Sequence, residues 1–412
     1  MRALVERDTD FLASLRLLPR AITPSTFSAG FVAAVMGVTG PTLLVFQAAV
    51  GAGFSKEEIG SWFFGIFVGG GLMTLVLALA YRQPMTAAYS IAGSALLVQV
   101  LPGFSLNEAV GAYLISGALI LLLGLSGLFE RIMRVVPAEI VLGMLAGVLL
   151  RFVVGLFPDF VAQPLLIGAT LLAFFLAHRL QRLLPPFTIA LAVGILLTLY
   201  LEPLGELSLT GGFTRPFFFP PAFTLDAFLS LSLPLMLLAL SSQNATGIGV
   251  LWTLGYRAPI NAITLATGLF SLLTAPMGGH GINLATPMTA ICGEEAAHPD
   301  PGLRYGAAIV NGILFALFGG VGVIAVELIE VLPLGLIRVI SGLALLPVIL
   351  NALQKSVGGE RHRFGCLFAL AIAASDVQWL GVGAAFWALV FASGISLLLD
   401  RDWGDDGDVS RP

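Results

Sequence analysis

The stretch APMGGHGINLATPMTAI, residues 275–291, places helix-breaking and polar residues inside an apolar region of the chain. An unperturbed imidazole titrates near neutral pH, so His280 is a candidate proton carrier. A neutral imidazole that is hydrogen-bonded to the broken backbone is the alternative, and both interpretations stay open. The residues of this stretch that are predicted to bind a small ligand are Gly279, His280, Gly281, Ile282 and Asn283.

The composition indicates that these residues lie in a membrane protein. Hydrophobic residues make up 58% of the 412 residues, charged residues only 11%, and the mean hydropathy is +0.98. Soluble domains carry about 25% charged residues. The chain is therefore predicted to be an all-α protein embedded in a lipid bilayer, and it has no basic stripe that would bind nucleic acid. The two cysteines, Cys292 and Cys366, are interpreted as buried core residues.

Segments of suitable length for the hydrocarbon layer recur along the whole chain. A span needs about 20 apolar residues, and the hydropathy pattern predicts about fourteen spans, of which the third and tenth are short and broken. The predicted spans cover 25–49, 59–81, 85–100, 108–128, 137–157, 163–180, 187–202, 226–252, 260–275, 281–293, 303–326, 334–351, 364–378 and 380–399.

The placement of basic residues predicts the orientation. With both termini inside, 16 of the 20 Lys and Arg residues fall on the cytoplasmic side, and only Lys56 and Arg215 fall on the opposite side. This asymmetry is what the positive-inside rule predicts. We expect an inner (plasma) membrane protein with a cytoplasmic segment 1–24 and a cytoplasmic tail 400–412. Of the two arginines within spans, Arg151 is interpreted as reaching toward the outer interface.

The two broken spans correspond to one another. RQPMTAAYSIAGSALL at 82–97 and TAPMGGHGINLATPMTAI at 274–291 both place Pro-Met after an apolar span, at Pro84 and Pro276. The segment VVPAEIVLGMLAGVLL at 135–150 likewise resembles VLPLGLIRVISGLALL at 331–346. Two halves of about seven spans each would be inverted relative to one another, which is typical of transporters.

Broken backbone within a bilayer must line a protein cavity, because lipid cannot satisfy its polar groups. We expect a half-helix to start at about Ile282, and a second one after Pro84 to Tyr89. Two helix N-termini that meet near the midplane would form an anion site from backbone N–H groups. Tyr89 and Ser90 are therefore predicted to bind the ligand.

A third predicted break interrupts the span 226–252. Polar side chains at that depth are site candidates, although they also bond neighbouring helices. Gln243 and Asn244 are predicted to bind ligand. For Ser241 and Ser242, ligand binding and hydrogen bonding to a neighbouring helix are equally supported. Thr39, in GVTGPTL at 37–43, occupies the comparable place in the first half.

Over nearly its whole length the chain resembles the benzoate/proton symporter family. The similarity is carried by AGFVAAVMGVTGPTLLVFQAA, MLAGVLLRF, SSQNATGI, GINLATPMTAICGEEAAHPDPGLRY and LGVGAAFWALV. The resemblance implies the inverted-repeat fold shared with nucleobase/proton symporters and anion exchangers. It implies a core domain formed by 25–128 and 226–326, and a gate domain formed by 137–202 and 334–399.

The resemblance also implies the substrate class. Nucleobase relatives carry acidic site residues on the eighth and tenth spans, where this chain has Gln243, Asn244 and Asn283. A fixed carboxylate would repel an anion, so their absence fits a small aromatic carboxylate that enters with protons. Phe46, Tyr89 and Met288 are the expected apolar walls.

Other functions remain as alternatives. A proton-coupled nucleobase transporter is disfavoured by the missing acids, and a passive anion channel would share the site but lack proton dependence. The four histidines are scattered and form no His-Glu-x-x-His motif, so an enzyme is not expected, nor is a metal or cofactor. A homodimer is left open.

Overall fold

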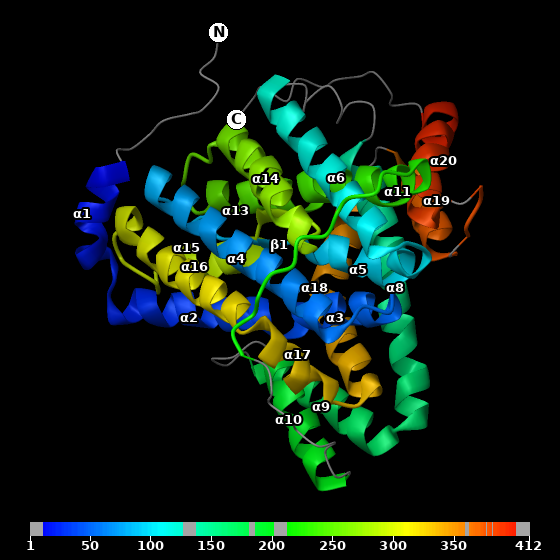
Figure 1. Ribbon diagram of the computed structural model, residues 1–412, viewed down its shortest axis with the longest axis horizontal. Coiled ribbons are helices and arrows are strands. Elements are labelled where there is room, and N and C mark those ends of the chain that lie inside the picture. The colour runs from blue at the N-terminus through cyan, green and yellow to red at the C-terminus, as the bar shows by residue number, and fades with distance from the viewer. Residues whose placement is uncertain are drawn as a thin grey trace.

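Helices dominate the computed structural model, which describes residues 11–126, 137–180, 186–201, 212–358, 362–375, 377–380 and 382–400 (Figure 1). Within these residues, 8 helical segments are long and apolar enough to cross a membrane. They cover Pro24–Gly51, Lys56–Tyr81, Leu106–Ser126, Ala138–Ala162, Leu225–Thr253, Ile260–Met277, Pro301–Gly320 and Leu334–Val357. Shorter apolar helices are Ile91–Gly103, Pro164–Leu180, Pro186–Leu201, Arg363–Ala374 and Ala384–Leu399.

The first half of the chain runs from α1 to α10. Its elements are α1 (Phe11–Ala21), α2 (Pro24–Val38), α3 (Gly40–Gly51), α4 (Lys56–Tyr81), β1 (Ala87–Tyr89), α5 (Ile91–Val100), α6 (Leu106–Ser126), α8 (Ala138–Ala162), α9 (Pro164–Leu180) and α10 (Pro186–Leu201). Residues 127–136, which include part of the predicted span 108–128, lie outside the described residues.

The second half begins with one long helical segment. It consists of α11 (Leu225–Ala227), a π-helical turn (Phe228–Ser232), α12 (Leu233–Leu237), a second π-helical turn (Leu238–Asn244) and α13 (Ala245–Thr253). The later elements are α14 (Ile260–Thr274), β2 (Ile282–Leu284), α15 (Thr286–Gly293), α16 (Tyr305–Gly320), α17 (Gly322–Glu330), α18 (Leu334–Val357), α19 (Arg363–Ala374) and α20 (Ala384–Leu399).

The structure corrects three predictions about where helices begin, end or break. The span 25–49 is divided at Thr39 into α2 and α3, because Thr39 leaves the helical region with a ψ of −107°. The helix expected from about Ile282 begins at Thr286, since Ile282–Leu284 pair as a strand. The break expected at Ser241 to Asn244 is wrong, because the backbone stays helical there through a π-helical turn.

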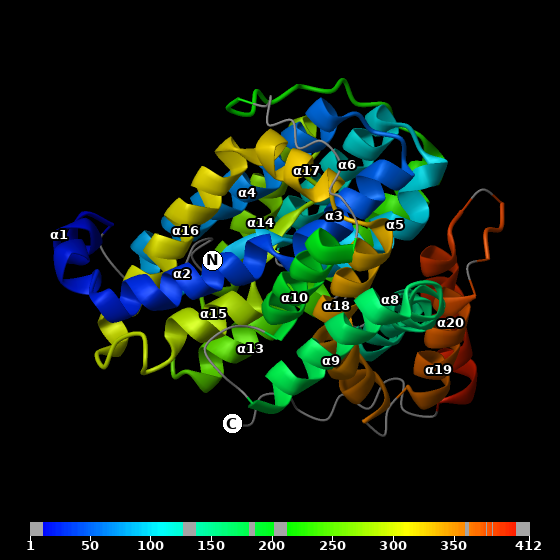
Figure 2. The ribbon, with the colours of Figure 1, turned by 90° about the horizontal axis from the view of Figure 1, so that it is seen from below.

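The helices form two packing groups, each of which contains helices from both halves of the chain. α2, α4, α6, α14 and α16 pack on one another, whereas α8 packs with α9, α18, α19 and α20. Figure 2 shows α8, α9, α18, α19 and α20 together at one side of the molecule, away from α1, α2 and α16. Glycines permit the close approach within each group. A Cβ at Gly71 would lie 2.5 Å from the carbonyl oxygen of Gly312, and one at Gly147 would lie 2.3 Å from that of Leu370.

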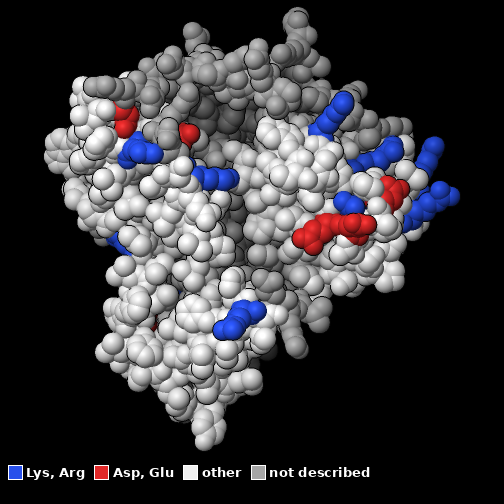
Figure 3. Space-filling model, turned by 180° about the vertical axis from the view of Figure 1, so that it is seen from behind, with Lys and Arg blue, Asp and Glu red and all other residues white. Residues whose placement is uncertain are grey.

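The surface of the molecule agrees with a bilayer environment. Large apolar side chains are exposed on several helices, for example Leu172 on α9, Leu317 on α16 and Leu398 on α20. Most of the face in Figure 3 carries no Lys, Arg, Asp or Glu side chain among the described residues. In water such surfaces would be unfavourable, so hydrocarbon is their expected solvent.

Candidate substrate site between the two broken spans

A two-stranded antiparallel ribbon joins the two broken spans. In β1 and β2, Ala87 pairs with Leu284, Ala88 with Asn283, and Tyr89 with Ile282. The strands form because neither segment can continue its helix: α4 and α14 end at Tyr81 and Thr274, shortly before Pro84 and Pro276. The ribbon satisfies backbone groups that lipid could not. It also fixes the start of α5 beside the start of α15.

A small cavity lies where these two helices begin. It has a volume of about 80 Å³. One side is formed by α2, α3, the ribbon and the starts of α5 and α15, and the other by α10 and α18. The lining residues are Met36, Gly37, Pro41, Ala88, Tyr89, Ile91, Phe187, Gln243, Ala285, Pro287, Met288, Ala344, Pro347 and Val348. No acidic side chain belongs to this described lining.

Some of the residues predicted from the sequence lie at this cavity. Tyr89 and Gln243 line it, as does Met288, which was expected as an apolar wall. Asn283 is not one of the lining residues, but it pairs with the lining residue Ala88, and directly opposed residues of two strands share a face. Both side-chain amide atoms of Asn283 are buried and have no hydrogen-bond partner. Such a group is costly unless a ligand satisfies it at some stage.

Asn244 does not line the cavity but bonds to neighbouring elements. Its Nδ2 donates to Oγ1 of Thr267 at 3.0 Å, and its Oδ1 accepts from the backbone N–H of Leu284 at 3.0 Å. Asn244 therefore connects the π-helical turn to β2 and α14, and it positions the ribbon.

His280 is buried but does not line the cavity. Its Nδ1 accepts from Nε1 of Trp62 at 3.0 Å, and its Nε2 contacts the carbonyl oxygen of Ser90 at 3.0 Å and Oγ of Ser94 at 2.9 Å. An indole N–H only donates and a carbonyl only accepts, so the hydrogen on the ring lies on Nε2. The imidazole thus joins α4 to the start of α5.

The remaining predicted residues are near the lining residues in the sequence but do not line the cavity. Ser90 caps α5 by accepting from the backbone N–H of Gly93 at 2.9 Å. The carbonyl oxygen of Gly281 accepts from the backbone N–H of Ser90, the backbone N–H of Gly279 donates to the carbonyl oxygen of Thr274, and Ile282 is buried. On α2 and α3, Thr39 donates to the carbonyl oxygen of Val35, and Phe46 is buried.

The lining residues that the sequence analysis missed are apolar. Phe187, Ala344, Pro347 and Val348 come from α10 and α18, and nothing in their residue types distinguishes them from residues that face lipid. Pro41 had a signal, because it follows Thr39 in the GVTGPTL motif.

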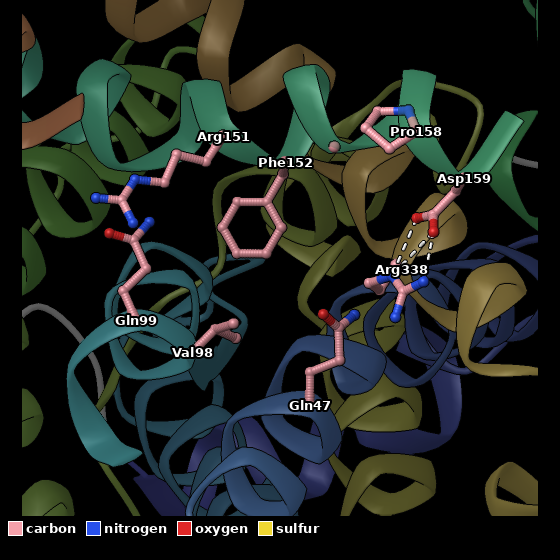
Figure 4. Close-up of a pocket in the computed structure, with 9 residues that line it drawn as sticks. Gln47, Val98, Gln99, Arg151, Phe152, Pro158, Asp159 and Arg338 are labelled. Carbon is pink, nitrogen blue, oxygen red and sulfur yellow. Dashed lines mark hydrogen bonds and ion pairs between the residues drawn. The ribbon is translucent and has the colours of Figure 1, made fainter. Parts of the chain in front are cut away.

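A second and larger cavity lies between α3 and α5 on one side and α8 and α18 on the other (Figure 4). Its volume is about 430 Å³, and its polar lining residues are Gln47, Gln99, Arg151, Asp159 and Arg338. The guanidinium of Arg338 forms an ion pair with the carboxylate of Asp159, with Nε 3.0 Å from Oδ2. None of these residues was predicted from the sequence to bind a ligand.

Comparison with known proteins places the chain in a family. The model of the benzoate membrane transport protein family matches residues 20–398. The chain belongs to this family. Its members are membrane transport proteins, so the prediction of a multi-pass transporter, and not an enzyme, is confirmed.

Two curated relatives match this chain over nearly the full length of both proteins. The inner membrane protein YdcO of Escherichia coli strain K12 is 35% identical over 93% of this chain and 98% of its own. A benzoate membrane transport protein of Acinetobacter baylyi is 32% identical over 91% of this chain and 95% of its own.

Solved structures show the fold at low sequence identity. The transmembrane domain of the cyanobacterial bicarbonate transporter BicA has a TM-score of 0.55 at 13% identity, and the match covers 96% of this chain and all of that domain. SLC26A9 has a TM-score of 0.60 at 13% identity, over 94% of this chain and 67% of its own. The predicted relation to anion-exchanger folds is confirmed.

Proposed function

We propose that this family member is a proton-coupled importer of benzoate or a related aromatic carboxylate in the inner membrane. The observation that carries the proposal is the cavity at the starts of α5 and α15. Tyr89, Phe187 and Met288 line it, and they offer an aromatic and apolar surface for a ring. The helix N-termini carry positive partial charge that favours a carboxylate. The relative from Acinetobacter baylyi supports the same substrate by its name.

The transport cycle is proposed to be alternating access. In this scheme the helices packed with α4 and α14 form the core, those packed with α8 and α18 form the gate, and about fourteen crossings are arranged as an inverted repeat. The cavity of about 80 Å³ is smaller than typical ligand pockets of roughly 300–1,000 Å³. Substrate binding would therefore require the gate residues Phe187 and Pro347 to move away from the core.

The proposed orientation has both termini in the cytoplasm. Lys56 and Glu330 then form their ion pair on the outer face, and the inner face carries most of the arginines. Glu330 and the buried Glu327 belong to α17, which continues beyond the predicted end of the span 303–326.

The function can be tested with purified protein in proteoliposomes. We expect an inward proton gradient to drive accumulation of radiolabelled benzoate. Unlabelled salicylate should compete with it, and unlabelled uracil should not. Competition by uracil would favour a nucleobase transporter, whereas benzoate flux without saturation or proton dependence would favour a channel. No benzoate uptake by folded protein would reject the proposed substrate.

Proton coupling is expected to survive the change His280→Gln. Protonation of Nδ1 would displace the indole N–H of Trp62, so the geometry of His280 favours a structural role. We propose that the substrate carboxylate binds as an anion and itself takes up the proton before it crosses. The variant should show slower uptake, because the connection from α4 to α5 is weakened, but an unchanged dependence on the proton gradient.

The measurement for this variant is benzoate uptake with and without the gradient, at matched protein density and with the unfolding temperature recorded. Retained downhill benzoate flux combined with loss of gradient-driven accumulation would identify His280 as the proton carrier instead.

A further inference from the structure

A polar side chain is enclosed in the packed helices beside the small cavity. Asn311 on α16 is completely buried. Its Nδ2 contacts the sulfur of Met288 at 3.9 Å, and its Oδ1 has no hydrogen-bond partner among the described residues. A thioether sulfur is only a weak acceptor. A buried amide in this state is costly, and a polar side chain within a membrane span is a candidate for ligand binding.

The packing of α16 along α2 places Asn311 in the same layer as the cavity. A Cβ at Gly30 would lie 2.4 Å from the carbonyl oxygen of Ala307. A Cβ at Gly37 would lie 2.6 Å from the ring of Phe315. Positions 307, 311 and 315 are neighbours on one helix face, so Asn311 faces α2 between these two contacts. Figures 1 and 2 show α2, α15 and α16 side by side.

Met288 separates Asn311 from the cavity. Met288 lines the cavity, and its sulfur lies against Gly37, where an added Cβ would be 2.7 Å away. Gly37 lines the cavity as well, and its carbonyl oxygen accepts from the hydroxyl of Tyr89 at 3.0 Å. Methionine is unbranched and has three rotatable bonds, so its thioether changes position easily. Such a change would enlarge the cavity of about 80 Å³ and open it to Asn311.

The amide of Asn311 suits a hydroxyl group on the ring of the substrate. A hydroxyl can donate to Oδ1 and accept from Nδ2, whereas the C–H edge of an unsubstituted ring does neither. A site built to bond a hydroxyl discriminates against the analogue that lacks it, because the polar group of the site is then left unpaired. The proposed place of the carboxylate is at the starts of α5 and α15, so a ring substituent can point past Met288 toward α16.

We infer that Asn311 is a further substrate-binding residue, which accepts a hydrogen bond from a ring hydroxyl when Met288 moves aside, and that hydroxybenzoates are therefore bound in preference to benzoate. This inference rests on the proposed function for the site and for the carboxylate. It adds a group that recognises the hydroxyl, which the binding of benzoate itself does not require.

Ligand binding to the purified transporter tests this preference. Titration calorimetry compares benzoate with the ortho, meta and para hydroxybenzoates and with the corresponding fluorobenzoates. Fluorine is small like a hydroxyl but cannot donate a hydrogen bond. We expect the wild type to bind at least one hydroxybenzoate about fivefold or more tightly than its fluorinated counterpart, which is the effect of one hydrogen bond. Equal affinities within every pair would overturn the inference.

Two variants test whether Asn311 causes the preference. Asn311→Val and Asn311→Ala both remove the amide, which makes no bond to oxygen or nitrogen within the described part of the chain. The preference should fall by about fivefold or more, whereas the affinity for benzoate should stay within about twofold of the wild type. A preference retained in both variants, or an equal loss of affinity for both ligands, would overturn the inference.

Val310→Ala is the matched control for lost packing on α16. Val310 precedes Asn311 and packs against Gly30, where an added Cβ would lie 2.7 Å from its own Cβ. This variant should lower the unfolding temperature but keep the preference for the hydroxybenzoate. If Val310→Ala lost the preference as Asn311→Val does, the effect would be one of packing and Asn311 would have no direct role.

Cysteine labelling tests whether Met288 covers Asn311. The wild type measures the background from its two buried cysteines. Met288→Ala should speed the labelling of Asn311→Cys by a small uncharged methanethiosulfonate, and the preferred hydroxybenzoate should slow it. Labelling of Val310→Cys should respond to neither change, because Val310 faces Gly30. The same response at both positions would reject the role of Met288.

The inference and the proposed function fail in different ways. A wild type that binds neither benzoate nor any hydroxybenzoate would reject both. Benzoate binding without a preference for a hydroxyl would leave the proposed function in place and overturn the inference. Hydroxybenzoate binding that depends on Asn311, without benzoate transport, would reject benzoate as the substrate and support the inference.

Discussion

Replacement of Gln243 by glutamate is expected to reduce kcat/KM for benzoate by about a hundredfold or more. Gln243 lines the small cavity, whose described lining contains no acid, and the change is nearly isosteric. Two like charges about 4 Å apart repel by roughly 4 kcal/mol at an effective dielectric constant of 20, which corresponds to about a thousandfold in binding. An introduced carboxylate would thus oppose the substrate carboxylate directly.

Two controls separate charge from the loss of the amide. Gln243→Met removes the amide without adding charge and should retain a larger share of uptake than Gln243→Glu. Acidic buffer should restore part of the uptake of Gln243→Glu relative to the wild type, because the introduced carboxyl becomes neutral. The measurement is initial benzoate uptake over a range of substrate concentrations and pH. Wild-type kinetics in Gln243→Glu would remove Gln243 from the site and weaken the assignment of the small cavity.

Hydropathy predicted the long helices well because a bilayer imposes one length and one polarity on every crossing. It could not predict where backbone departs from a helix for tertiary reasons. Ile282 to Leu284 become a strand only because Ala87 to Tyr89 pair with them from the other half of the chain. In the same way, Thr39 ends α2 within an apolar run, and the polar residues near Gln243 remain helical.

The sequence predicted polar residues of the cavity lining, but it did not predict most of the apolar ones. Tyr89 and Gln243 stand out in apolar segments, and both line the small cavity. The residues from α10 and α18, such as Phe187 and Pro347, carry no such mark, because the residues that face a substrate ring are also those that face lipid. The ion pair of Asp159 and Arg338 joins residues 179 positions apart, so no local pattern reveals it.

Asn283→Ala is expected to reduce benzoate uptake by about tenfold or more while leaving stability unchanged, because a hydrogen bond to a charged group contributes roughly 1.5–3 kcal/mol. In the structure the side-chain amide of Asn283 is buried and has no hydrogen-bond partner. Its removal therefore breaks no internal bond. The loss should instead come from a bond made only to the substrate.

Asn244→Ala is the matched comparison, because it removes the same side chain from a neighbouring element. It would leave the backbone N–H of Leu284 buried without its acceptor, so its unfolding temperature should fall along with its uptake. Ser242→Ala, outside the described lining, should change uptake less than Asn283→Ala does. Uptake kinetics and thermal unfolding of all three variants in detergent separate the two roles. Undiminished uptake by Asn283→Ala would show that this face of the ribbon does not contact the substrate. The site would then consist of Tyr89, Gln243 and the gate residues that line the small cavity.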